Sequence, residues 1–308
     1  MQEKNKKVVV ILGATATGKT KLAVRLASIF NGEIISADSR QVYKGMDIGT
    51  GKDLAEYEIR SKKEPRNVPH HLIDIVSPKT AFNVAKYQKM AYRAIASIQK
   101  KGKVPFLVGG TGLYIDAVVK GINFAQIENK NLSEIRKRLD KMSLSQLLLK
   151  LQKIDKNTYN VIDKKNRRRV QRALEIYYQT GKKKSEQNMI KPDLDFLVLG
   201  VDLPLLEIYK KIDKRLETRL TEGMVKEVNM LRDKGVSWKR LDQFGLEYRY
   251  ASRFLRGQIK YEEMFEQLKN AIHHFAKRQI TWFKRNQEIV WITNLNQAKS
   301  EINGFLKK

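Results

Sequence analysis

A glycine-bounded loop that ends in lysine and threonine is the stretch of this sequence best suited to chemistry. Residues 13–20 read Gly-Ala-Thr-Ala-Thr-Gly-Lys-Thr, which fits the pattern G-x-x-x-x-G-K-T. In such a loop the backbone N–H groups surround a phosphate, and the lysine ammonium adds positive charge. We therefore predict a phosphate-binding site, with the Thr20 hydroxyl as a ligand of the expected cofactor, Mg²⁺; its residues are Gly13, Ala14, Thr15, Ala16, Thr17, Gly18, Lys19 and Thr20.

The segments on either side of this loop have the character that phosphate binding requires. Residues 8–12 are apolar, mostly β-branched and too few for a helix, so they predict a buried parallel strand. Residues 21–30 have apolar side chains at helical spacing. A strand, a glycine loop and a helix in this order direct the helix N-terminus at a bound anion. This order favours phosphate binding over a glycine-rich turn with a chance lysine.

Two carboxylates lie in or after other predicted strands. Residues 33–38 form a second short strand that ends at Asp38, and ligands of open α/β sheets bind beyond the carboxyl ends of strands. We therefore expect Asp38 to face the same crevice as the glycine loop. Asp74 lies within a predicted strand at 68–78, where a magnesium-side carboxylate, a helix cap and a buried hydrogen bond all remain open.

The remaining elements predict an α/β fold with a P-loop-containing parallel sheet flanked by helices. A helix at 82–101 separates the strand at 68–78 from one at 104–108, and this alternation favours parallel strands. Leucine stripes at 121–165 indicate a mainly helical insertion, so we assign 1–120 and 166–308 to the core. Its C-terminal part should be helical after a last strand at 196–201; the expected helices are 206–219, 224–234 and 261–284, and residues 299–308 carry no predicted role.

Composition narrows the class of protein. The 308 residues include 61 Lys and Arg against 33 Asp and Glu, a formal charge of +28. Such an excess predicts a polyanionic partner, nucleic acid first, although a lysine-rich proteome or a gain in solubility would also produce it. The chain has no cysteine, which excludes disulfides, thiolate metal sites and a cysteine nucleophile. The apolar run at 8–12 is too short for a signal peptide or a membrane span, so we expect a cytoplasmic protein without membrane contact.

Two further clusters have chemistry-bearing residue types. Residues 166–175 open a helix with several arginines, which either grip phosphates or form a solvated face. The histidine pairs at 70–71 and 273–274 are adjacent in sequence, so the two rings of each pair diverge and lack metal-ligand spacing. We do not expect a zinc site.

Taken together, the motifs resemble the tRNA dimethylallyltransferase family. The resemblance runs in order from about residue 8 to residue 285. The stretches at 35–50 and 276–283 are far more specific than the glycine loop alone. The matching stretches are residues 13–20, 35–50, 108–114, 168–175, 223–228 and 276–283.

This resemblance implies transfer of a dimethylallyl group from dimethylallyl pyrophosphate to the 6-amino group of an adenosine next to the tRNA anticodon. It implies that Asp38 is the general base, that Thr111 contacts the reacting region, and that Arg215 helps the glycine loop to bind pyrophosphate. The helical insertion would contact the anticodon stem, and no obligate protein partner is evident. The implied tRNA contacts are Asp38, Ser39, Arg40, Gln41, Arg168, Arg169, Val170, Gln171 and Arg172.

The chain departs from the family pattern at two places. Residues 244–250 read Phe-Gly-Leu-Glu-Tyr-Arg-Tyr where Gly-Tyr-Lys-Glu is common, and residues 272–275 read Ile-His-His-Phe where Thr-Arg-Arg-Tyr is common. Both bear on substrate contacts, and they leave room for a tRNA-binding paralogue with reduced catalysis.

Two further enzyme classes share the glycine loop. A P-loop small-molecule kinase would explain that loop but not the charge or residues 276–283. An adenylate-directed prenyltransferase would share the core motifs, but the length and charge of this chain favour a polymeric substrate. We therefore expect a tRNA-modifying transferase.

Overall fold

A computed structural model describes residues 6–59, 66–124, 131–186 and 191–308 of the chain. It divides into two compact units. The first contains the residues up to Val119 together with Asp193–Lys308, and the second is Lys120–Pro192. The second unit is therefore an insertion between two halves of the first.

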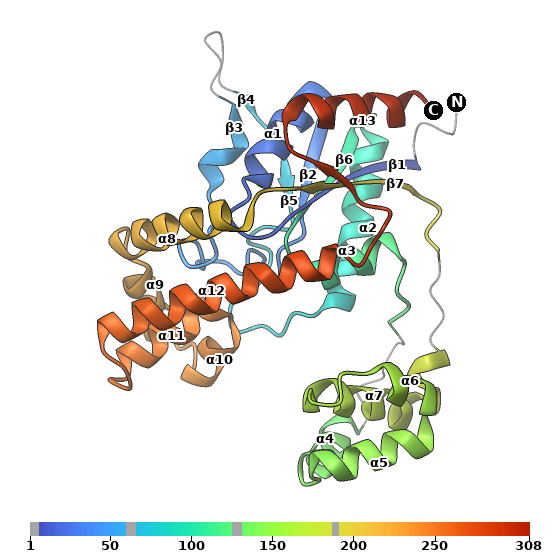
Figure 1. Ribbon diagram of the computed structural model, residues 1–308, viewed down its shortest axis with the longest axis vertical. Helices are drawn as coiled ribbons and strands as arrows, with labels where there is room; N and C mark the ends of the chain where they lie inside the picture. The colour runs from blue at the N-terminus through green and yellow to red at the C-terminus, as the bar shows by residue number, and fades with distance from the viewer. Residues whose placement is uncertain (1–5, 60–65, 125–130, 187–190) are drawn as a thin grey trace. The chain divides into compact units, whose positions relative to one another are not determined.

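The first unit is built on a six-stranded parallel sheet with the strand order β5-β2-β6-β1-β7-β8 (Figure 1). The central strand β1 (Lys7–Leu12) is buried along its whole length and pairs with β6 (Val104–Gly109) and β7 (Asp195–Val201). Next to β6 lies β2 (Gly32–Ser36). These strands agree with the predicted parallel α/β fold.

Helices cover both faces of this sheet. On one face α1 (Lys19–Ile29) and α13 (Leu295–Lys307) bury Leu26 and Ile302 against β1 and its neighbours. On the other face α2 (Val84–Lys100) and α3 (Gly112–Val119) bury Tyr87 and Ile115. A sheet covered on both sides needs strands that are apolar throughout, which is why residues 8–12 have no polar alternation.

The C-terminal part is helical, as expected, up to residue 283. It contains α8 (Leu205–Thr221), α9 (Met224–Asp233), α10 (Trp238–Gln243), α11 (Leu246–Leu255) and α12 (Tyr261–Phe283). The prediction of no strand after residue 201 is wrong, because β8 (Val290–Ile292) pairs in parallel with β7. Residues 299–308, which had no predicted role, lie in α13 up to Lys307. An edge strand of three residues is too short to show a periodic pattern.

The predicted strand at 68–78 shrinks to β5 (His70–His71). Leu72 and Asp74 have φ values of 64° and 54°, so the backbone enters the left-handed region and leaves the sheet. Before β5 the chain forms the 3₁₀ helix η2 (Leu54–Tyr57) and a separate antiparallel pair, β3 (Glu58–Ile59) with β4 (Arg66–Asn67).

The second unit is helical, as predicted, but larger than predicted. Its helices are α4 (Leu132–Asp140), α5 (Leu144–Ile154), α6 (Lys156–Val161) and α7 (Arg167–Thr180), followed by the short η3 (Lys184–Glu186). The predicted boundary at residue 165 is wrong, because Val170 and Leu174 of α7 pack with Leu139 of α4 and Leu147 of α5 in one apolar cluster. Helix α7 therefore belongs to the insertion and not to the core. None of the helices in the described ranges is long and apolar enough to span a bilayer.

Candidate active site

A cavity of about 840 Å³ opens in the first unit, beyond the carboxyl ends of β1, β2 and β6. Its walls come from the glycine loop, from residues 36–53, from the turn at 108–113 and from α8, α11 and α12. This is where ligands of parallel α/β sheets bind. The glycine loop, the segment after β2, the turn after β6 and part of the motif at 276–283 therefore meet at one place.

The glycine loop divides into a lining layer and a supporting layer. Residues Thr15, Ala16, Gly18, Lys19 and Thr20 line the cavity, whereas the other three lie buried beneath them. In the buried layer the Thr17 hydroxyl donates to the Ala14 carbonyl at 2.9 Å, and a Cβ at Gly13 would meet that same hydroxyl at 2.9 Å. Gly13, Ala14 and Thr17 thus shape the loop from below.

Two cations face the cavity next to this loop. Lys19 Nζ donates to the Ala14 carbonyl at 3.2 Å, and the Arg215 guanidinium donates to the Thr15 hydroxyl. Burial lowers the pKa of Lys19 to about 8, although the nearby Asp38 carboxylate works in the opposite direction. Burial and then the neighbouring Arg219 lower the pKa of Arg215 to about 10. Positive charge that is desolvated in this way is stabilised by a bound anion.

The predicted base and its neighbour also meet at this cavity. Asp38 lies two residues after β2, and its Oδ1 accepts from the backbone N–H of Arg40 at 2.8 Å and of Gln41 at 3.4 Å. Among the described residues both of these hydrogen bonds go to Oδ1, and Oδ2 accepts neither of them. Thr111 accepts from the backbone N–H of Ser39 at 3.1 Å, which joins the end of β6 to the Asp38 loop.

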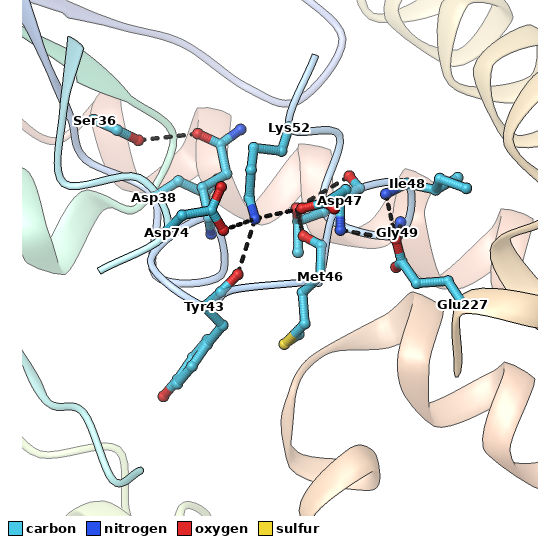
Figure 2. Close-up of polar contacts among 12 residues, drawn as sticks. Ser36, Asp38, Tyr43, Met46, Asp47, Ile48, Gly49, Lys52, Asp74 and Glu227 are labelled. Carbon is cyan, nitrogen blue, oxygen red and sulfur yellow. Dashed lines mark hydrogen bonds and ion pairs between the residues drawn. The ribbon is translucent and has the colours of Figure 1, made fainter. Parts of the chain in front are cut away.

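Residues 38–52, the Asp38 loop, are held on one side by a buried lysine. Lys52 Nζ donates to Asp74 Oδ1 at 2.5 Å and to Asp47 Oδ1 at 2.6 Å (Figure 2). Of the three roles open to Asp74, the structure fits the hydrogen-bonded one. Within the described ranges, no group of three or more His, Cys, Asp or Glu side chains could hold a metal ion. A Mg²⁺ ion at Thr20 would take its other ligands from phosphate oxygens and water.

A carboxylate from α9 holds the same loop on another side. Glu227 accepts from the backbone N–H groups of Asp47, Ile48 and Gly49 at 2.8, 2.7 and 3.1 Å (Figure 2). The Tyr248 hydroxyl donates to the same carboxylate at 2.6 Å. The motif at 223–228 thus acts on the Asp38 loop, and Tyr248, one of the departures from the family pattern, supports it.

The motif at 276–283 ties the glycine loop to the second glycine turn. Gln279 Oε1 accepts from the Thr15 N–H at 2.9 Å, and its Nε2 donates to the Gly110 carbonyl at 2.7 Å. Trp282 Nε1 donates to Asp116 Oδ2 at 3.0 Å. Sequence reasoning assigned no role to Gln279, Glu227 or Lys52. The first two lie in motifs that carried the family resemblance, which was the available signal.

Residues from both stretches that depart from the family pattern, 244–250 and 272–275, pair with residues of α8 in the first unit. Glu247 lies 3.8 Å from Arg219, and both line the cavity. His273 of α12 bonds Asp213 of α8 at 2.6 Å and stacks on Tyr209 with ring centroids 4.1 Å apart. His273 of α12 therefore connects this helix to α8.

The structure places the arginine cluster in the other unit, on α7. Arg168 and Arg169 are exposed, and Arg172, also exposed, pairs with Glu175 at 2.9 Å. Gln171 donates to Asp140 at 2.7 Å. Val170 is fully buried, so its side chain cannot contact RNA directly. Of the expected tRNA contacts, Asp38, Ser39, Arg40 and Gln41 line the cavity in the first unit.

The fold and the site define a class of protein: a P-loop enzyme whose cavity places two cations beside a carboxylate. Comparisons with known proteins make the assignment specific. The family model described as IPP transferase matches residues 41–286. The tRNA dimethylallyltransferase 1 of Syntrophus aciditrophicus (strain SB) is 45% identical over 309 residues, which cover 98% of this chain and 99% of that protein.

Solved structures agree with this match. The full-length tRNA isopentenylpyrophosphate transferase from Bacillus halodurans superposes with a TM-score of 0.69 at 36% identity, covering 98% of this chain and 96% of that one. A eukaryotic dimethylallyltransferase acting on tRNA gives a TM-score of 0.74 at 29% identity, covering 97% of this chain and 77% of that one. The chain belongs to the tRNA dimethylallyltransferase (IPP transferase) family.

Proposed function

We propose that this protein transfers a dimethylallyl group from dimethylallyl pyrophosphate to the 6-amino group of an adenosine adjacent to the tRNA anticodon. One observation carries the proposal beyond family membership. A carboxylate able to accept a proton, Asp38, lines the same cavity as the two cations suited to a leaving pyrophosphate, Lys19 and Arg215. A base and a leaving-group site in one cavity are what this transfer requires.

The pyrophosphate would lie against the glycine loop. The positive N-terminus of α1, Lys19 and Arg215 would stabilise the negative charge that develops as the allylic carbon–oxygen bond breaks. Thr20 lines the cavity at the start of α1, where its hydroxyl would hold Mg²⁺. When bound, that ion would add further positive charge at the leaving oxygens. Leu113, Phe275 and Trp282 supply apolar lining for the five-carbon group.

Asp38 would act on the nucleophile. The adenine nitrogen forms a bond to the allylic carbon, the carbon–oxygen bond breaks with its electron pair leaving on pyrophosphate, and the nitrogen gives a proton to Asp38. Hydrogen bonds from Arg40 and Gln41 hold Oδ1 in place and leave Oδ2 for this transfer. Thr111 orients the neighbouring residue through the Ser39 N–H. The adenine of the tRNA must leave the anticodon-loop stack to reach the cavity.

The remaining tRNA contacts would be electrostatic. The net charge of +28 suits a polyanion, and the exposed arginines 168, 169 and 172 of α7 would neutralise phosphates of the anticodon stem. The protein would work in the cytoplasm, where its tRNA substrate is. We propose no obligate protein partner.

The test is transfer of radiolabelled dimethylallyl from its pyrophosphate to unmodified tRNA under single-turnover conditions, beside the Asp38→Asn variant. Asparagine keeps the size of the side chain and an acceptor oxygen but cannot take the proton. We expect the parent to label tRNA and the variant to react about 10²–10⁴-fold more slowly at unchanged pyrophosphate affinity. Labelling of AMP instead of tRNA, or phosphate transfer from ATP, would refute the proposal. A variant rate within about threefold of the parent would remove Asp38 from the mechanism.

A further inference from the structure

Lys52 has an unusual environment for a lysine in a loop that lines a cavity. Its side chain is 0% exposed. An ammonium group that is removed from water is unfavourable unless charged and hydrogen-bonding partners surround it. Because Lys52 belongs to the wall of the cavity, one role to consider is that of a further ligand for pyrophosphate.

The partners of Lys52 rule out that role in the structure. Besides Asp47 at 2.6 Å and Asp74 at 2.5 Å, Nζ donates to the Tyr43 carbonyl at 2.9 Å (Figure 2). A lysine ammonium has three protons, and these three bonds engage all of them. The three acceptors come from the middle of the Asp38 loop and from the segment after β5. Lys52 therefore connects the end of the loop to its own middle and to the segment that follows β5.

The segment that supplies Asp74 is itself strained and pairs with the loop. Asp74 has a φ of 54°, a region that non-glycine residues keep only where their surroundings hold them. Its N–H donates to the Gln41 carbonyl at 3.0 Å, and the Ile75 N–H donates to the Val42 carbonyl at 2.9 Å. The bond to Lys52 holds the side chain of the same residue. Backbone and side chain of Asp74 thus both grip the Asp38 loop.

Gln41 connects this arrangement to the proposed base. Its N–H contacts Asp38 Oδ1 at 3.4 Å, and its side chain bridges the Gly51 carbonyl at 3.2 Å and the Ser36 hydroxyl at 3.0 Å. Gly51 directly precedes Lys52. Movement of Lys52 would therefore reach Asp38 through a single intervening side chain, that of Gln41.

We propose that the buried Lys52 ammonium, together with Asp47 and Asp74, forms a clasp that keeps the Asp38 loop in the conformation in which Asp38 can accept a proton. Lys52 is then a positioning residue and does not bind pyrophosphate. The inference rests on the proposed function for its kinetic consequence, but the conformational consequence can be measured without any reaction. Positioning errors on the order of 1 Å cost about 10²-fold in rate, which sets the size of the expected effect.

The test uses Lys52→Met and Asp74→Asn, singly and together. Methionine is apolar and similar in length to lysine, so it can occupy the buried position of Lys52. The carboxylates of Asp47 and Asp74, whose side chains are 57% and 37% exposed, can still reach water, so the fold should survive. Lys103→Met is the matched control: it also removes a lysine from an ion pair, but Glu33 keeps Lys101 and His71 as partners. Each variant is measured for thermal midpoint, dimethylallyl pyrophosphate affinity, single-turnover transfer and amide hydrogen exchange of residues 38–50.

We expect the single-turnover rates of Lys52→Met and Asp74→Asn to fall about 10- to 100-fold, with affinity for dimethylallyl pyrophosphate within about twofold of the parent. The double variant should be no slower than Lys52→Met, because either change opens the same clasp. Amide hydrogen exchange at residues 38–50 should rise in Lys52→Met and in Asp74→Asn, but not in Lys103→Met.

Three results would overturn the proposal. The first is a single-turnover rate of Lys52→Met or Asp74→Asn within about twofold of the parent. The second is amide hydrogen exchange at residues 38–50 that does not change in these variants. The third is a loss of pyrophosphate affinity of about tenfold at unchanged rate, which would make Lys52 a substrate ligand. If the parent transfers no dimethylallyl group, the proposed function fails, and the exchange comparison alone decides whether the clasp exists.

Discussion

At the scale of single residues, the site is dominated by partly desolvated positive charge on Lys19 and Arg215. Lys19 has a pKa of about 8 because burial disfavours its ammonium form more than the Asp38 carboxylate favours it. A bound pyrophosphate stabilises the ammonium, so the pKa of Lys19 must rise on binding. Linkage then requires that the affinity for the anion depend on pH.

We predict that affinity for dimethylallyl pyrophosphate is constant well below pH 8 and falls as the pH rises through about 8, where the free enzyme loses the Lys19 proton. Lys19→Ala should bind the ligand more weakly at pH 7 and lose this pH dependence, while its affinity for tRNA stays nearly unchanged. Titration calorimetry between about pH 6.5 and pH 9 measures both. Equal loss of tRNA affinity would show that the glycine loop holds RNA instead.

Glu247 is one of several acidic residues that line the cavity, and it lies beside an arginine. It lies 3.8 Å from Arg219, and its charge also acts on Arg40 and Arg215. A carboxylate at this place opposes anion binding, so Glu247→Gln should tighten binding of inorganic pyrophosphate by about two- to tenfold. Tighter binding cannot arise from a damaged fold. Glu217→Gln, an exposed residue of α8 outside the cavity lining, is the control. Unchanged or weaker binding to Glu247→Gln would contradict the prediction.

At the scale of elements, local patterns predicted what local forces determine. The order of strand 8–12, glycine loop and helix was predictable because each part has a local pattern. A strand buried on both faces is an uninterrupted apolar run, and the loop requires glycines at a fixed spacing. The strand at 68–78 was overestimated because its apolar side chains continue after Leu72 turns the backbone out of the sheet. Helix α7 was assigned to the wrong unit because its apolar stripe does not reveal which neighbour covers it.

Helix α7 carries the element-scale prediction. We expect tRNA affinity to fall steeply with salt, and Arg168→Ala and Arg169→Ala each to reduce the slope of log affinity against log salt by about one. Arg172→Ala should reduce it less, because Glu175 already offsets its charge. Binding assays from about 50 to 300 mM salt measure the slopes. Arg25→Ala, an exposed arginine of α1 in the other unit, serves as the control. Slopes that match the parent in all three α7 variants would leave the cluster as a solvated face.

At the scale of the whole molecule, the site depends on contacts between distant parts of the sequence. Glu227 reaches Asp47 across 180 residues, and Gln279 reaches Thr15 across 264. The candidate base and the phosphate loop were predictable because each belongs to a local motif. The residues that hold them in place were not, because no periodicity or spacing encodes such distant pairs. The family resemblance marked their motifs without showing what they touch. Net charge was readable from composition alone, because it is a sum and needs no contacts.

A buried carboxylate in the sheet links the stability of the molecule to pH. Glu33 is 1% exposed and lies within 2.8 Å of Lys103 and His71 and 3.1 Å of Lys101. Burial alone would raise its pKa, but hydrogen bonds from Lys103, His71 and Lys101 outweigh burial and lower the pKa to about 2 from 4.5. A carboxylate whose pKa is lower in the folded state stabilises the fold above the unfolded pKa. This stabilisation is lost as the pH falls from about 4.5 to about 2.

We therefore predict that Glu33→Gln lowers the free energy of unfolding at pH 7 by about 1–3 kcal/mol, and that the difference from the parent shrinks as the pH approaches 2. The fold should survive, because Lys101 and Lys103 are 49% and 30% exposed and can turn to water. Urea denaturation at about pH 7, 4.5 and 3 measures the difference, with the exposed Glu58→Gln as a control that should match the parent throughout. A difference as large at pH 3 as at pH 7 would mean that the variant loses packing and not an ion pair. The ion pairs of Glu33 with Lys101, Lys103 and His71 would then contribute little to the free energy of unfolding.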